Sequence, residues 1–454
     1  MRSLSLCLPA ALLLAVLWSV PTRVSAAEWQ AGVAKAKITP RQPMWMSGYG
    51  SRDHRAEGTL TDLWTKVVVL QDERGERVVL VSLDLVGIPR DMAQKICAAL
   101  KQLHGLERRQ IAFFCSHTHT GPMVGSNLAT MFDLKPEDQA LVDEYALELQ
   151  ANILGAVSSA IEKLAPSRLS WANGHATFAV NRRTNMEAAV PQVRVFGALN
   201  GPVDYDVPVL AVRSLNGELR AIIFGYACHS TVLSFYQWSG DYPGFAQIEL
   251  EKSHPEAVAL FFAGCGADQN PLPRREVAIA EKYGKELATE VDTVINGVMQ
   301  PVKGALRAQY EEVPLPFDTL PTLEKLQTDT KDGNVYVARR AKALLKQIEA
   351  GQPLSPSYPY PLQLWRLGDL QWVTLGGEVV VDYSLRIKRE LGREHTWVAG
   401  YTNDVMAYIP SARVLKEGGY EGGGAMLYYG LPTIWGTAVE DTLIKGVHGL
   451  AAQP

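Results

Sequence analysis

IAFFCSHTHTGP, residues 111–122, is the stretch from which the fold of this chain is predicted. Its first five residues are apolar, as in a buried strand, and His117 and His119 then follow before a Gly121-Pro122 turn. In extended backbone, side chains two residues apart point to the same face, so the two imidazoles are predicted to lie together. The end of a strand is also where an open α/β sheet places its ligand crevice, and imidazole suits zinc. An isolated pair of this kind more often just begins a loop, so the rest of the chain must decide.

The residues before this stretch predict a strand–helix–strand unit. Lys66–Leu70 and Arg77–Leu85 have strand patterns separated by a turn, and Asp91–Leu103 has apolar residues at helical spacing. A strand, a helix and a second strand in this order favour a right-handed crossover and a parallel pair. Residues 31–58 are predicted to be irregular.

The residues after it alternate between helices and strands. Helices are predicted at Pro136–Leu164, Arg275–Met299 and Thr322–Ala350, and Gly368-Asp369 predicts a hairpin between two later strands. The other predicted strands are Ser167–Ala172, Ala176–Val180, Val209–Ser214, Leu219–Ala227 and Ala257–Ala263. A proline-rich segment at 351–361 is the best linker candidate. We predict an α/β fold of layered mixed sheets flanked by helices, with a metal site at the C-terminal ends of strands, in one domain over residues 27–454.

The N-terminus and the composition indicate an exported, soluble protein. Arg2, the apolar run Leu4–Val20 and the small residues Val24-Ser25-Ala26 are typical of a signal peptide over residues 1–26, cleaved near Ala26. No later run reaches 18 apolar residues, so no transmembrane span is expected. A net charge of -4 without any Lys/Arg block argues against nucleic acid as a partner. No essential disulfide is expected among the four remaining cysteines, Cys97, Cys115, Cys228 and Cys265.

Four loops that follow predicted strands carry side chains able to bind metal or protons. They hold His117 with His119, His229, Asp268 with Asn270, and Glu378. Two histidines, a carboxylate and an open position form a catalytic zinc arrangement. Taken alone, His229 is more often a satisfied histidine at a sheet edge, and Glu378 more often a carboxylate at a helix N-terminus.

Several short motifs occur in one order along almost the whole chain after the signal peptide. They are His117–Pro122 (HTHTGP), Asn181-Arg182, Ala227-Cys228-His229, Gly377-Glu378, and the stretch from Tyr401-Thr402-Asn403 through Tyr408 to Tyr420-Glu421. Together they resemble the neutral/alkaline ceramidase family, zinc-dependent amidohydrolases of N-acylsphingosines, whose signature is HTHSGP. Single motifs are weak, but the ordered set is specific.

The resemblance implies a role for each matched residue. It implies Zn²⁺ as the cofactor, with His117, His229, Glu378 and Tyr408 as its ligands. It implies that His119 lies beside the metal, where it is placed to shuttle a proton, and that Arg182 and Tyr420 hold the scissile amide and its developing oxyanion. On ordinary grounds Tyr408 would be a packing tyrosine and Arg182 a surface ion-pair partner, and the Arg182-Arg183 doublet leaves the choice between the two arginines open.

The chain departs from the family pattern at two places. Asp268 falls where the family has a functional serine, and it would contact substrate, act as a general base through water, or cap its loop. Members of the family carry a C-terminal immunoglobulin-like domain, which this sequence is expected to lack because it ends at Pro454, so the resemblance is expected to cover the catalytic domain only. Both departures bear on the ceramide substrate more than on hydrolysis.

The predicted function is that of an exported zinc-dependent hydrolase that cleaves the linear amide bond of a ceramide-like N-acyl substrate in sphingolipid metabolism. Its partner would be a lipid or small-molecule N-acyl compound, with contact to a membrane surface for substrate. Residues 44–55 and 418–424 are predicted to rim the pocket with aromatic side chains. Two alternatives stay open: a hydrolase of another amide, ester or lactone on the same scaffold, and a non-catalytic metal- or ligand-binding periplasmic protein.

Overall fold

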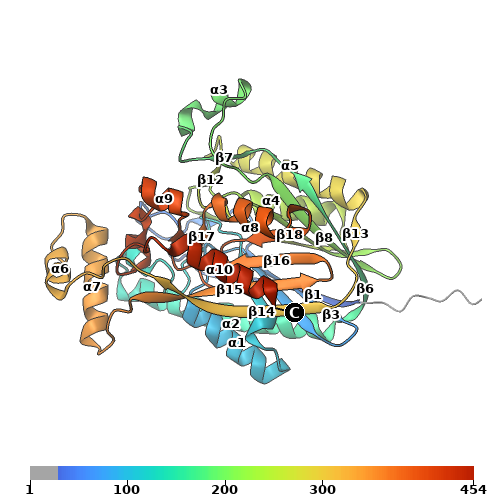
Figure 1. Ribbon diagram of the computed structural model, residues 1–454, viewed down its shortest axis with the longest axis horizontal. Helices are drawn as coiled ribbons and strands as arrows, with labels where there is room; N and C mark the ends of the chain where they lie inside the picture. The colour runs from blue at the N-terminus through green and yellow to red at the C-terminus, as the bar shows by residue number, and fades with distance from the viewer. Residues whose placement is uncertain (1–28, 454) are drawn as a thin grey trace, which may run out of the picture.

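A nine-stranded mixed sheet forms the centre of the molecule (Figure 1). The computed structural model describes residues 29–453, so the predicted signal peptide at 1–26 lies outside the described residues. The strand order is β11-β9-β8-β6-β1-β3-β4-β5, with β13 paired to β6. The strands are β1 (Trp29–Lys37), β3 (Trp64–Asp72), β4 (Arg77–Leu83), β5 (Ile111–Cys115), β6 (Ala165–His175), β8 (Asp206–Ser214), β9 (Leu219–Tyr226), β11 (Val258–Ala263) and β13 (Gln300–Pro301).

The predicted strand–helix–strand unit is present as β4, α1 (Arg90–His104) and β5. The two strands are parallel, with Val79 opposite Ile111 and Leu83 opposite Cys115. The strands β9 and β11 form a second parallel pair, connected through α4 (Asp241–Ser253). The carboxyl ends of both pairs lead into the loops that carry the predicted histidines, which is where parallel strands of α/β proteins present functional side chains.

A second sheet packs against the first through aromatic side chains. It has the order β14-β15-β16-β18, with bounds Leu306–Pro316, Ser357–Leu367, Leu370–Leu375 and Thr396–Ala399. Phe114 and Phe262 of the first sheet contact Trp372 of the second, with ring centroids 5.2 and 4.7 Å apart. Alternate residues of each strand therefore face this shared core, and the intervening residues face helices.

Helices cover the outer face of each sheet, which gives four layers (Figure 1). The first sheet is covered by α1, α2 (Pro136–Glu162), α4 and α5 (Val277–Asn296). The second is covered by α8 (Val381–Leu391) and α10 (Val439–Ala452). This arrangement confirms the predicted fold class of layered mixed sheets flanked by helices. No helix within residues 29–453 is both long and apolar enough to cross a bilayer.

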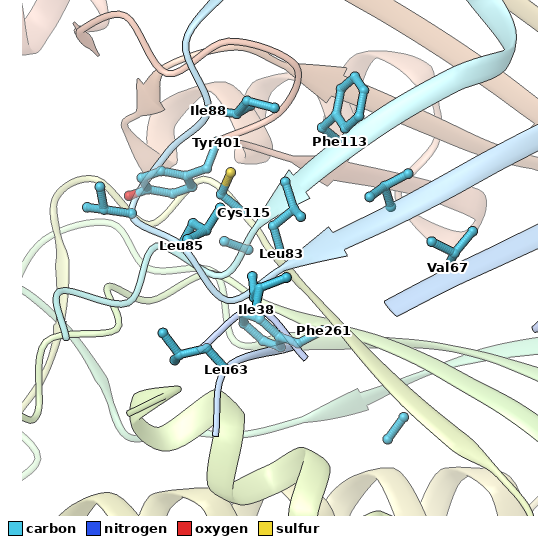
Figure 2. Packing of buried hydrophobic residues seen from close by; sticks show 14 of the residues in the cluster. Ile38, Leu63, Val67, Leu83, Leu85, Ile88, Phe113, Cys115, Phe261 and Tyr401 are labelled. Atoms are coloured by element: carbon cyan, nitrogen blue, oxygen red, sulfur yellow. The ribbon is translucent and has the colours of Figure 1, made fainter. Parts of the chain in front are cut away.

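The first sheet curls until its two edges approach each other. Ser82 Oγ of β4 donates a hydrogen bond of 2.7 Å to the carbonyl of Phe261 in β11. Figure 2 shows Phe261 packed near Ile38 and Leu83, residues that belong to the same buried cluster. Because the edges meet, the loops after β5, β9 and β11 gather at one place, although they are far apart in the sequence.

Four features of the fold differ from the sequence prediction. Residues 31–37, predicted to be irregular, belong to the central strand β1, because β3 pairs along its whole length. The long helix predicted at 322–350 is two helices, α6 (Leu323–Asp329) and α7 (Val335–Glu349), since Asn334 caps the second by accepting a hydrogen bond from the Tyr336 amide. Strand β15 begins inside the segment predicted as a linker. The helix α4 and the strand β14 were not predicted.

Candidate metal centre and active site

The first two histidines leave strand β5 through a strained turn. The strand ends at Cys115, and His117 has a left-handed φ of 59°. The expectation that the two imidazoles share a face because the backbone is extended is therefore wrong. They still meet, with His117 Nε2 and His119 Nε2 3.1 Å apart. A non-glycine residue in this conformation is uncommon and costs free energy, which is typical of functional sites.

Backbone carbonyls fix the orientation of the two central imidazoles. His117 Nδ1 lies 2.6 Å from the carbonyl oxygen of Val86, and His229 Nδ1 lies 2.8 Å from that of Gly266. A carbonyl only accepts, so each Nδ1 carries the proton and each Nε2 presents a lone pair. Burial, followed by the positive charge of Arg182, lowers the pKa of His229 to about 4, which keeps this ring neutral.

A short strand pair brings the predicted carboxylate and tyrosine to the same point. β17 (Glu378–Val379) and β19 (Tyr408–Ile409) are parallel, and Glu378 pairs directly with Tyr408. Glu378 Oε2 lies 3.1 Å from His117 Nε2 and 3.2 Å from His229 Nε2. The Tyr408 hydroxyl lies 3.3 Å from His229 Nε2. All four residues predicted as metal ligands therefore converge.

The converging atoms fit a divalent cation. Glu378 Oε2 is buried without a hydrogen-bond donor, and the two nearest nitrogens present lone pairs to it. A buried carboxylate oxygen that faces two nitrogen lone pairs costs free energy unless a positive charge lies among the three atoms. His117, His119 and His229 also offer ring nitrogens that all lie within 4.8 Å of one another. The buried histidine cluster can bind a metal ion, and nitrogen with carboxylate ligands suits zinc.

Arg182 is the arginine that faces this cluster. Its Nη2 donates to the Tyr408 hydroxyl at 3.2 Å, and its Nε donates to Glu421 at 2.7 Å. Arg183 turns away and pairs with Glu421 and Glu417. Burial alone would lower the pKa of Arg182, but Tyr408 and Glu421 raise it well above its usual value. Of the two arginines left open by the sequence, Arg182 is the one that contacts Tyr408.

Tyr420 and His119 lie at the edge of the cluster. The Tyr420 side chain is 44% exposed, and its ring centroid is 5.2 Å from that of Tyr408. His119 is buried against the ring of Tyr49, 4.8 Å away, and its Nδ1 has no partner. A Cβ on Gly48 would lie 2.6 Å from the His119 ring, so only glycine fits at that place. The segment 44–55 thus packs directly on His119.

Asp268 has both carboxylate oxygens engaged by neighbouring groups. Oδ1 accepts from the Val381 amide at the start of α8 at 2.8 Å, and Oδ2 accepts from Asn181 Nδ2 at 3.1 Å. Its own carbonyl accepts from the Arg182 amide. Among the three sequence alternatives, these contacts favour capping of the loop. Through these contacts Asp268 connects the start of α8 to Asn181, the residue before Arg182.

Comparison with known proteins identifies the family to which this geometry belongs. A sequence model of the N-terminal part of neutral/alkaline non-lysosomal ceramidases matches residues 29–271, which is more than half of the chain. The chain belongs to the neutral/alkaline ceramidase family. It is 22% identical over 465 residues to the neutral ceramidase of Mycobacterium tuberculosis, covering 84% of this chain and 71% of that protein. Family membership makes it a hydrolase of amide bonds.

Solved ceramidase structures have the same fold. The neutral ceramidase of Pseudomonas aeruginosa superposes with a TM-score of 0.72 at 20% identity, over 92% of this chain and 73% of that one. A ceramidase complexed with C2 gives a TM-score of 0.72 at 19% identity, over 92% and 74%. The resemblance predicted from the ordered motifs is confirmed at the level of family and fold.

Sequence reasoning missed Tyr429, which contacts the centre directly. Its hydroxyl donates a short hydrogen bond to Glu378 Oε1 and leaves Oε2 facing the two histidines. No motif marked this tyrosine, because it follows a glycine-rich loop and stands next to Tyr428, which packs on Tyr336 instead. Glu421, which holds Arg182, was quoted within a motif but given no role.

Proposed function

We propose that this chain is an exported zinc-dependent amidohydrolase that cleaves the N-acyl amide bond of ceramide-like lipids. His117, His229, Glu378 and Tyr408 would hold the ion. Family membership supports the amide-hydrolase part of the proposal. The observation that carries the rest is the convergence of two histidine lone pairs on Glu378 Oε2, a buried oxygen without a donor.

A zinc ion held by His117, His229, Glu378 and Tyr408 would supply Lewis-acid chemistry at this place and would lower the pKa of water there toward ~7. The Arg182 guanidinium and the Tyr420 hydroxyl would hold the carbonyl oxygen as it gains negative charge. His119 would move the proton to the leaving nitrogen through its ring nitrogens. Burial lowers the pKa of His119 well below its usual value, so the free ring is neutral and keeps a lone pair on one ring nitrogen. We assign Asp268 to holding Asn181 and α8.

A cavity beside Arg182 and Tyr420 supplies room for substrate. Its volume is about 570 Å³, and it is lined by arginine, glutamate and asparagine side chains as well as the 417–421 loop. Amide and hydroxyl groups of a lipid head can form hydrogen bonds with such a wall. The acyl chains would extend outward from it, because the wall is polar. We also propose that residues 27–454 act as one catalytic domain.

The experiment is hydrolysis of a substrate panel by the purified protein, before and after removal of metal with a chelator. The panel holds a fluorescent ceramide, a short-chain N-acyl amide, an ester and a lactone of matched acyl chain. The proposal expects the two amides to turn over fastest, chelation to abolish turnover, and added zinc to restore it. Faster turnover of the ester or lactone would overturn the amide assignment. Turnover that survives chelation would overturn the metal mechanism.

A further inference from the structure

A charge-poor arm stands out from the body next to the candidate active site. Residues 184–203 leave strand β7 (Ala179–Asn181), pass through α3 (Val190–Val195) and return, and they project beyond the rest of the fold (Figure 1). Of these residues only Glu187 and Arg194 are charged. Both charges are used at the base, since Arg274 holds the Glu187 carboxylate at 2.7 and 2.8 Å and Arg194 donates to the Phe178 carbonyl.

Hydrogen bonds between its two ends close the base of the arm. Asn185 Nδ2 donates to the Asn200 carbonyl at 2.7 Å, and the Asn200 amide donates to Asn185 Oδ1 at 3.0 Å. Thr184 Oγ1 adds a hydrogen bond of 2.8 Å to the same carbonyl. Val190 is buried against Val180 and Leu272 in a small separate core. The arm therefore has its own small apolar core. The large apolar side chains that stay exposed on the arm are not buried in that core.

Three large apolar side chains point into solvent from this arm. The exposed fractions are 77% for Met186, 82% for Val195 and 82% for Phe196. Ala188, Pro191 and Ala198 are also exposed on the arm. Exposed large apolar groups on a charge-free tip are costly in water and mark an interaction surface.

We propose that the tip of the 184–203 arm, with Met186, Val195 and Phe196, inserts into the surface of a lipid bilayer beside the active site. This inference rests on the proposed lipid substrate, and it names the residues through which the protein would bind the bilayer that contains this substrate. A side chain as large as Phe buries about 150–250 Å², so three cannot supply the about 800 Å² per partner that a stable protein interface needs. An uncharged tip matches the hydrocarbon boundary of a bilayer, where each large apolar side chain shifts partitioning about tenfold to hundredfold.

The position of the arm connects the bilayer to the chemistry. The polar cavity next to Arg182 and Tyr420 is also lined by Asn185 and Glu187, at the foot of the arm. With the tip inserted in a bilayer, a lipid that leaves this bilayer would reach the cavity with its polar head first. The arm thereby places the amide of an amphiphile near Arg182 while its chains stay in the membrane.

The test compares Val195→Ser/Phe196→Ser with a control, Leu147→Ser, which removes a 71%-exposed apolar side chain from α2, on the opposite side of the molecule from the arm (Figure 1). Binding to phosphatidylcholine vesicles is measured by flotation, and turnover is measured on vesicle-embedded ceramide and on a short-chain soluble N-acyl amide. We expect the arm variant to lose vesicle binding and vesicle turnover about tenfold to hundredfold, with soluble turnover and the control unchanged.

The outcomes separate this inference from the proposed function. Equal vesicle binding by the arm variant and the native chain overturns the inference, even when both hydrolyse the soluble amide. Loss of binding in the arm variant supports it, even when no amide in the panel is hydrolysed. A native chain that self-associates through the arm, shown by sedimentation of the two proteins at several concentrations, overturns it in favour of a second copy as the occupant.

Discussion

Tyr429→Phe should weaken metal binding without changing the ligands themselves. The substitution removes the hydroxyl that donates to Glu378 Oε1 and leaves the ring in place. Without this donor, the carboxylate is free to rotate its Oε2 away from His117 and His229. Removing a hydrogen bond to a charged group costs about 1.5–3 kcal/mol. Loss of a group that orients a metal ligand typically lowers metal affinity about tenfold to hundredfold, which corresponds to ~1.4–2.7 kcal/mol.

The assay for this variant is competition between the apoprotein and a chromophoric chelator for zinc at pH 7.5, with kcat measured on the metal-loaded protein. The absorption spectrum of the cobalt-substituted protein gives a second readout, because it reports ligand geometry directly. Tyr428→Phe is the matched control, since that neighbouring ring packs on Tyr336 and should leave affinity unchanged. Zinc affinity within twofold of the native chain, with an unchanged cobalt spectrum, would refute the positioning role.

Three further predictions test other parts of the site. Arg182→Lys should lower kcat about 10²–10³-fold with metal content intact, because one amine cannot hold both Tyr408 and Glu421, whereas Arg183→Lys should change kcat little. Asp268→Asn should keep turnover within a few-fold and lower the free energy of unfolding by about 1–2 kcal/mol, as a capping residue would; a large loss of kcat at full stability would indicate a general base. Burial raises the pKa of Asp404 to about 7 from 3.8. The folded state therefore binds this proton more tightly, and native stability falls as the pH rises from about 4 to about 7. The free energy of unfolding of Asp404→Asn, relative to that of the native chain, should therefore rise over that pH window by on the order of 4 kcal/mol and then level off. A difference in thermal stability that does not change with pH would contradict the assignment.

The sequence predicted those parts of the fold that have a regular pattern. The strand–helix–strand unit around residues 77–115 and the hairpin at Gly368 follow from local periodicity and turn residues, and both are present. Strand β1 was missed because its small and charged residues lack a clear alternation, and it is held by pairing with β3. The break between α6 and α7 depends on one turn whose cap, Asn334, carries little signal within a helical pattern.

For the site, the motifs identified residues but not the way they come together. The left-handed φ of His117 is set by the loop and is invisible to a rule based on extended backbone. The meeting of Glu378 with Tyr408 depends on a two-residue strand pair, and that of His117 with His229 depends on the curl of the sheet. Tyr429 acts through a tertiary contact alone, so no local pattern could have named it.

The measurement that tests the central claim most directly is zinc content and amide hydrolysis on the same preparations of the native chain and His229→Ala. His254→Ala is the control, because His254 pairs with Asp292 at a partly buried place instead of facing the cluster. The account predicts about one zinc per chain in the native and control proteins, and loss of both zinc and hydrolysis in His229→Ala. Absence of zinc from the native chain, or the same zinc content in His229→Ala, would contradict the assigned metal centre.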